Sequence, residues 1–227
     1  MKTLAALIVC ACSTLSAQNA DPTLVREVAA VRAELMRSHN ELLKYTWVEQ
    51  TDVVVDKKLT SSDSASAGYD REGRILRTPL QDKEKIGSKQ TSNRPLVRSK
   101  GEMRDYIERA ISRIRDYAPP DPKVIDHLVQ SGQAVMEPSS GGTMAVRMNH
   151  YYQDGDSVVF TYEAGSKRIT RVLVSSNIVG NKDPISLEAT YELLPGNVNH
   201  LATAILKAPS KKVQVTVKNI DYRKLVD

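Results

Sequence analysis

Residues 213–219 read VQVTVKN. Val213, Val215 and Val217 alternate with polar residues, so a strand here has one apolar face and one face for water. The apolar face of such a strand needs further strands beside it and another layer over it to be buried. This stretch therefore predicts a β-sheet that is covered on one side.

Five further stretches with the character of strands lie upstream. They are residues 143–152, 158–162, 168–175, 185–192 and 200–208. Turn-forming sequences rich in glycine, proline, asparagine and aspartate separate them. Because connections this short favour antiparallel neighbours, residues 143–219 predict a meander of six strands.

Another group of strands is expected between residues 45 and 78. Trp47, Val53 and Val55 share one face of an expected strand, and Asp56-Lys57-Lys58 after it has the composition of a hairpin turn. The Ser- and Thr-rich residues 60–67 fit either a return strand or a mobile loop. A second turn then leads into an expected strand at 74–78.

Helical patterns flank these strands. Asp21 and Pro22 are a typical N-cap and first helical residue, and an apolar stripe continues to about Lys44. Residues 81–100 are polar with almost no periodicity, which indicates a flexible surface insertion. Residues 101–136 then show helical spacing again and are expected to form a helical insertion.

This insertion is expected to hold two helices. The spacing predicts one over 102–117, preceded by Ser99 and Glu102 at the spacing of a capping box. The other is expected to begin at Pro122, with Asp121 as its N-cap, and to run to Val135. The predicted fold class is therefore α+β. A curved antiparallel sheet, or incomplete β-barrel, is covered by an N-terminal helix and by the helical insertion.

The N-terminus has the layout of a secretory signal peptide. Lys2 supplies a positive charge, an apolar run follows, and small residues lead to Ala17, where cleavage is expected. Residues 1–17 are then the signal peptide, and residues 18–227 form a single periplasmic or secreted domain. An alternative stays open because Cys10 and Cys12 lie in the apolar run: Cys12 would carry a lipid anchor.

Composition and charge narrow the class of partner. The chain has 227 residues, of which 41% are hydrophobic and 26% charged, and a formal net charge of +5. Basic and acidic residues are interleaved, so no nucleic-acid partner is expected. Beyond the signal no stretch approaches the roughly 20 apolar residues of a membrane span, whereas peripheral membrane contact through anionic headgroups stays open.

The sequence lacks the usual patterns of catalytic and metal sites. The four histidines are far apart, and neither a G-x-S-x-G elbow nor a phosphate-binding glycine loop occurs. Asp154 and Asp156 flank Gly155 without the other ligands of a calcium loop, so a hairpin tip is expected there. We therefore expect no enzyme, no cofactor and no metal.

Two stretches carry a resemblance to a known family. They are Tyr69-Asp70-Arg71-Glu72-Gly73 and the run from Arg168-Ile169-Thr170-Arg171-Val172 through Leu194-Pro195-Gly196-Asn197 to Lys218-Asn219-Ile220-Asp221-Tyr222. With the expected order of elements, the chain resembles the LolA-like periplasmic lipoprotein carriers and the RseB/MucB-type lipid-sensing domains. The resemblance implies an incomplete barrel whose concave apolar face, covered by helices, holds acyl chains.

Two functions stay open at this point. In the first, the protein binds an acyl lipid or a lipoprotein, as a carrier or sensor, and the apolar strand residues that touch it are Trp47, Val53, Phe160, Val172 and Ile205. The same residues would also suit a filled core. In the second, the protein is an envelope module that grips a protein partner, with residues 81–100 as its loop. An apolar cavity of several hundred cubic ångström would favour the first function.

Overall fold

The computed structural model describes residues 21–80, 94–117, 121–178 and 183–225. Its helices are α1 (Pro22–Leu42), α2 (Arg94–Arg115) and α3 (Pro122–Gln130). Its strands are β1 (Tyr45–Val55), β2 (Lys58–Tyr69), β3 (Ile75–Pro79), β4 (Ala134–Pro138), β5 (Thr143–Asn149), β6 (Ser157–Glu163), β7 (Ile169–Asn177), β8 (Pro184–Leu194), β9 (Val198–Ala208) and β10 (Val213–Lys224). The short 3₁₀ turns η1 (Ser140–Gly142) and η2 (Pro209–Lys211) precede β5 and β10.

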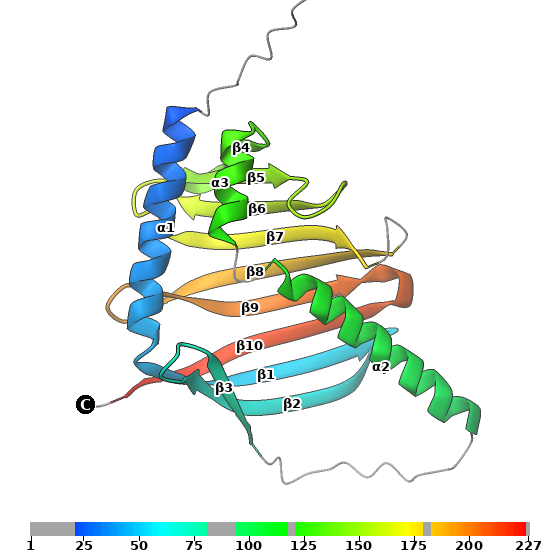
Figure 1. Ribbon diagram of the computed structural model, residues 1–227. Helices are drawn as coiled ribbons and strands as arrows, with labels where there is room; N and C mark the ends of the chain where they lie inside the picture. The colour runs from blue at the N-terminus through cyan, green and yellow to red at the C-terminus, as the bar shows by residue number, and fades with distance from the viewer. Residues whose placement is uncertain (1–20, 81–93, 118–120, 179–182, 226–227) are drawn as a thin grey trace, which may run out of the picture.

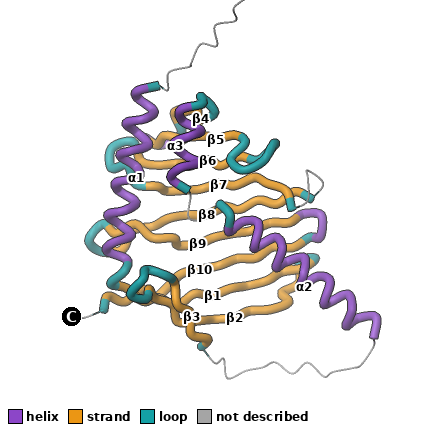
Figure 2. The backbone as a smooth tube through the Cα atoms, viewed as in Figure 1, coloured by secondary structure: helices purple, strands orange, loops and turns teal. Residues whose placement is uncertain are grey.

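The ten described strands form one antiparallel sheet in the order β3-β2-β1-β10-β9-β8-β7-β6-β5-β4. Pairing of β1 with β10 brings Tyr45 opposite Lys224 and joins the two groups of strands. The sheet is curved and stays open between its edge strands β3 and β4 (Figures 1 and 2). The predicted fold class is confirmed. Residues 60–67 are part of strand β2, which settles the choice between strand and loop.

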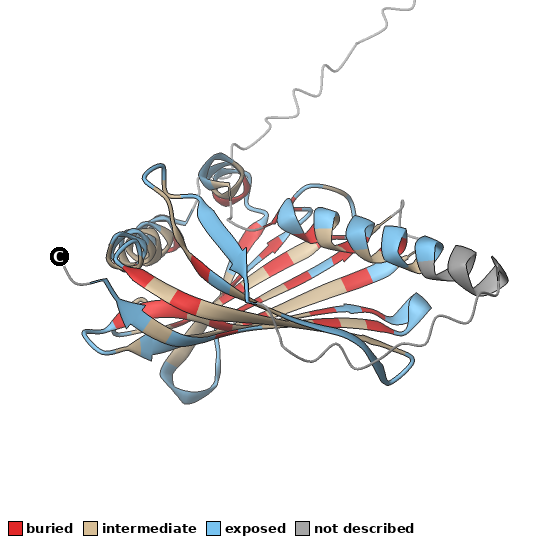
Figure 3. Cartoon of the chain, turned by 90° about the horizontal axis from the view of Figure 1, so that it is seen from below, coloured by how far each residue is buried: buried red, intermediate tan, exposed pale blue. Residues whose placement is uncertain are grey.

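All three helices lie on the same side of the sheet (Figure 3), and we call the face toward them the inner face. Helix α1 packs on β9, α2 on β8, and α3 on β4 and β5. The predicted N-caps are confirmed: the side chains of Asp21 and Asp121 accept hydrogen bonds of 2.8 Å from the backbone N–H groups of Thr23 and Lys123. The buried core lies between the helices and the inner face.

Helix α2 begins at Arg94, inside the stretch 81–100 that was expected to be a flexible polar insertion. The predicted capping box is wrong, because Ser99 and Glu102 both lie within the helix. Pro95 fits the first turn, where no backbone donor is needed, and the charged residues after it have good helix propensity. The sequence did not predict the start of this helix, because the segment is largely polar and its first turns show no apolar periodicity.

Strand β4 occupies residues that were expected to continue a helix to Val135. Helix α3 ends at Gln130, and Gly132 follows with a φ of +73°. The N–H of Gln133 donates to the carbonyl of Leu128 at 2.9 Å, which is the pattern of a Schellman motif. The glycine therefore stops the helix and turns the chain into the sheet.

Three expectations lie outside the described residues: the signal peptide with cleavage near Ala17, lipid attachment at Cys12, and the part of the polar insertion at 81–93. Within the described part of the chain, none of the helices has the length and apolar character that a membrane crossing requires.

Candidate functional site

Rows of side chains run across the inner face, because directly paired residues of neighbouring strands point to the same side. One row contains Met148, Val158, Val174, Leu187, Leu206, Val215 and Val53, in order from β5 to β1. The neighbouring row contains Val146, Phe160, Val172, Ala189, Ala204, Val217 and Thr51. The inner face is thus almost entirely apolar across seven strands.

Burial is uneven along both rows: in the first, Leu187 is partly buried, while Leu206 and Val215 beyond it are each 5% exposed. Met148 and Val158 at the β5–β6 end are 2% and 1% exposed, whereas Val53 on β1 is only half-buried. The second row shows the same trend, from Val146 at 3% exposure to the half-buried Thr51. The inner face is filled from β5 to β7, and from β8 to β1 partly buried positions occur beside buried ones such as Leu206 and Val215.

We call the partly covered region the half-covered floor. It consists of Val53, Val55, Leu187, Tyr191 and Leu201, which are partly buried and pack at the margin of the core. The helices also pack partly buried apolar side chains against the core: Val28, Val31 and Leu35 from α1, and Met103, Ile107 and Ile111 from α2. Apolar groups that remain partly accessible therefore occur on the floor and on both helices.

The five predicted contact residues are not all in this region. Val53 belongs to the half-covered floor. Phe160 and Val172 are paired directly on the inner face, but they are 7% and 8% exposed and belong to the filled part. Whether any of them touches a ligand stays a prediction.

Ile205 is placed differently. It pairs with Glu188 and Thr216, while the inner-face residue beside it is Leu206. Because side chains alternate along a strand, Ile205 points to the outer face, away from the other four residues. The alternation of β9 contains the signal, since Thr203 and Lys207 mark the same face as polar.

Trp47 lies in a series of rings that sequence reasoning missed. His39 of α1 lies 5.4 Å from the ring of Tyr69, which lies 5.3 Å from Trp47. Trp47 in turn stacks on Tyr222 at 5.5 Å, and Tyr222 lies 4.3 Å from His200. Burial raises the pKa of the Tyr69 hydroxyl. The indole Nε1 of Trp47 is buried and finds no hydrogen-bond partner among the described residues.

A charged pair lies next to Trp47 on the same strand face. Arg77 of β3 reaches across β2 and donates two hydrogen bonds to Glu49 of β1, at 2.6 and 3.0 Å. The hydrogen bond that Arg77 donates to Glu49 raises the pKa of Arg77. This end of the inner face therefore combines apolar side chains with one ion pair, and could accept a ligand with a polar end.

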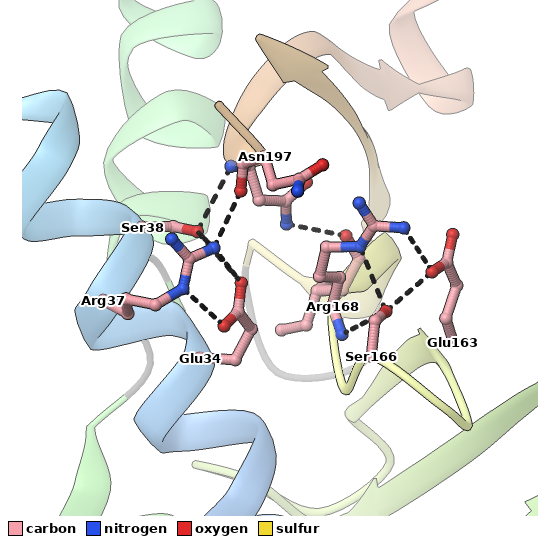
Figure 4. A network of polar contacts seen from close by, with 9 residues as sticks. Glu34, Arg37, Ser38, Glu163, Ser166, Arg168 and Asn197 are labelled. Atoms are coloured by element: carbon pink, nitrogen blue, oxygen red, sulfur yellow. Dashed lines mark hydrogen bonds and ion pairs between the residues drawn. The ribbon is translucent and has the colours of Figure 1, made fainter. Parts of the chain in front are cut away.

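Polar contacts fix α1 against the sheet (Figure 4). Arg37 binds Glu34 at 2.6 and 2.8 Å and donates to the carbonyl of Asn197 in the β8–β9 turn at 2.7 Å. The buried hydroxyl of Ser38 accepts a hydrogen bond from the N–H of Asn199 at 3.2 Å. Helix α1 is therefore a fixed wall of the site.

Two hollows open on the described surface. One, of about 110 Å³, lies between α1 and α3 and is lined by Val25, Arg32 and Val129 among others. The other, of about 510 Å³, lies at the β1–β2 turn. Neither of these two hollows is lined by residues of the half-covered floor.

No family model and no curated protein matches the sequence. Among solved structures, the chain is similar to a DUF1329 family protein from Desulfovibrio piger, with a TM-score of 0.42, 8% identity and coverage of 90% of this chain and 93% of that one. It is also similar to a LolA superfamily protein from Nitrosomonas europaea (TM-score 0.41, 7% identity, coverage 87% and 94%). A third similar structure is an outer membrane lipoprotein-sorting protein domain from Vibrio parahaemolyticus (TM-score 0.40, 8% identity, coverage 88% and 92%). The last two are described in the terms of the group that the sequence resembles.

Proposed function

We propose that the protein binds the acyl chains of a lipid or a lipoprotein on the half-covered floor. It acts as a carrier or sensor in the cell envelope, and not as an enzyme. The observation that carries this proposal is the unequal cover of the inner face: the apolar rows continue to β1, while Val53, Leu187 and Leu201 stay only partly buried.

The chemistry of the floor supports an acyl ligand. Its side chains are aliphatic except for Tyr191, and burial raises the pKa of the Tyr191 hydroxyl, so the phenol stays neutral. Each methylene that is buried contributes about 0.8 kcal/mol, and ten carbons contribute roughly 8 kcal/mol before the cost of ordering the chain. The ion pair of Glu49 and Arg77 offers polar groups to the headgroup end.

The interaction module remains the second candidate, because one observation favours it. The core from β5 to β7 is filled, and neither of the hollows described above is lined by floor residues. A protein partner that lays an apolar segment on the floor would need no enclosed cavity. The two functions differ in what copurifies with the protein.

Substitutions at neighbouring positions of β1 test the proposal. Val53 and Val54 are both half-buried but point to opposite faces of the sheet. We expect Val53→Lys to abolish the displacement of a fluorescent hydrophobic probe by lysophospholipid, because the ammonium group would lie among the floor residues. Val54→Lys is the matched control and should leave displacement unchanged.

Native mass spectrometry of protein purified from a bacterial envelope identifies the ligand class. Copurified lipid that is lost in Val53→Lys supports the acyl-binding function. Protein that emerges without lipid, and whose probe fluorescence is the same in both variants, contradicts it and favours the interaction module. Thermal melting of each variant shows whether it is folded.

A further inference from the structure

The end of the sheet at the β1–β2 turn is lined by lysines. The hollow of about 510 Å³ is bordered by Lys57, Lys207 and Lys212, and Asp56 is the single acidic residue in its lining. Lys58 and Lys211 are exposed beside it. We call these five lysines the tip surface.

Only part of this charge is neutralised within the protein. Lys212 Nζ lies 2.9 Å from Asp56 Oδ1. Lys57 and Lys207 have no acidic partner among the described residues, and both are exposed. Charges from two hairpins that are far apart in the sequence, β1–β2 and β9–β10, therefore converge on one hollow.

The backbone at two of these lysines is strained. Lys57 has a φ of +64° and Lys212 a φ of +53°, a region that glycine or asparagine adopts more readily. Glycine is common at the second central position of such a two-residue hairpin turn. A long cationic side chain at these positions therefore has no advantage for folding, which points to a role for the charge itself.

An exposed apolar side chain accompanies the lysines. Leu59 is 62% exposed and pairs with Val54, which pairs with Gln214 and through it with Lys207, so Leu59 and Lys207 share the outer face. Lysines around an exposed leucine match the charged headgroups and the apolar boundary of a bilayer surface.

We propose that the tip surface docks on a bilayer that contains anionic phospholipid, with lysines of the tip surface on headgroup phosphates and Leu59 at the acyl boundary. A cluster of four or more lysines is the size at which such attraction becomes appreciable. Docking is independent of the half-covered floor, since it uses the outer face and the hairpin tips.

Vesicle sedimentation tests the proposal. The protein is purified from a bacterial envelope with Cys12→Ser, so that no acyl anchor can form. We expect it to bind vesicles of equal parts phosphatidylglycerol and phosphatidylcholine, to release at high salt, and not to bind phosphatidylcholine alone. Each lysine near an anionic surface changes affinity about fivefold, so Lys57→Gly with Lys207→Gln should weaken binding about 25-fold.

The variants separate binding from folding. Because glycine relaxes the backbone at position 57, Lys57→Gly should not lower the melting temperature even though it weakens docking. Arg26→Gln with Lys123→Gln is the control, since it removes the same charge from exposed positions on α1 and α3. Equal loss in the control pair, or equal binding to both kinds of vesicle, would overturn the proposal.

A third arm separates a membrane from a soluble anion. Calorimetry measures whether inorganic phosphate binds the protein at millimolar concentration. If it does, and if that phosphate also releases the protein from vesicles at constant ionic strength, the hollow is assigned to a free anion instead. If vesicle binding is lost while lipid still displaces the hydrophobic probe, the acyl-binding function stands. If probe displacement is lost while the protein still binds vesicles, the docking proposal stands.

Discussion

One side chain, Tyr117, joins the chain just after helix α2 to the sheet. Its hydroxyl donates to Asp156 Oδ2 at 2.6 Å and lies 2.7 Å from Ser176 Oγ, while Arg113 donates to it at 3.0 Å. Burial, with a further contribution from the hydrogen bond to Asp156, raises the pKa of Tyr117, so it remains a donor. Asp156 itself is 2% exposed, and its other side-chain oxygen has no partner among the described residues.

We expect Tyr117→Phe to lower the free energy of unfolding by about 1.5–3 kcal/mol, because a buried carboxylate loses its side-chain donor. The measurement is urea unfolding followed by circular dichroism. Tyr152→Phe is the matched control: Tyr152 is 41% exposed, lies 5.2 Å from the Tyr117 ring and should change stability by less than about 0.5 kcal/mol. Equal effects of the two variants would contradict the role given to the hydroxyl.

Whether a contact of a single residue could be predicted depends on how far apart its two partners lie in the sequence. The caps at Asp21 and Asp121 were predictable, because the capping side chain and the N–H that donates to it lie two residues apart. The link between Tyr117 and Asp156 was not, because 39 residues separate them and the sequence around Asp156 indicates only a turn. Asp154 lies at the exposed hairpin tip that the sequence predicts, and its side chain is 99% exposed.

Helix α1 is held by a second polar contact, toward its N-terminal end. Glu27 accepts hydrogen bonds from Lys167 Nζ at 2.7 and 2.9 Å and from the Tyr162 hydroxyl at 2.9 Å. The Lys167 hydrogen bond lowers the pKa of Glu27 below its ordinary 4.5, against the opposing effect of burial. This contact ties the helix to the β6–β7 turn.

The lowered pKa makes this contact sensitive to acid. The folded form keeps Glu27 ionised at a lower pH than the unfolded form, so the stabilisation is full above pH 4.5 and is lost as the pH falls through the lowered pKa. We expect Glu27→Gln to cost about 1–3 kcal/mol at pH 7, and much less at the lowest pH at which the protein stays folded. Chemical unfolding across this range measures both.

Glu137→Gln provides the comparison for that series. Glu137 lies 3.9 Å from Arg147 at the surface, so its removal should change stability little at any pH. A constant difference between Glu27→Gln and wild type at every pH would mean that the ionised contact with Lys167 contributes nothing.

Elements were predictable where one local pattern determined them. Strand alternation and turn residues located β5 to β10, and the caps located α1 and α3. The start of α2 and the whole of β4 were missed, because a polar first turn and a glycine stop carry no apolar periodicity. Ile205 lies on the outer face, which the polar residues Thr203 and Lys207 at alternate positions of β9 indicate.

At the scale of the molecule, the sequence indicated a covered curved sheet but not how far the cover extends. Cover depends on where the helices cross the strands, which is set by contacts between distant segments such as Arg37 with Asn197 and Tyr106 with Asp183. The half-covered floor is therefore a property of the assembled fold. Its residues look like ordinary core residues in the sequence.

A ligand that occupies this floor must stabilise the whole fold, because it binds residues from β1, β8 and β9 together. At about 100 times its dissociation constant, a lysophospholipid would add roughly 2.7 kcal/mol to the free energy of unfolding. For a chain of this size the melting temperature should rise by about 5–10 °C. Val53→Lys should lose this rise, whereas the pair Lys57→Gly and Lys207→Gln should retain it, because the tip surface lies outside the floor. A rise that both variants lose, or both keep, would mean that the floor is not where the lipid binds.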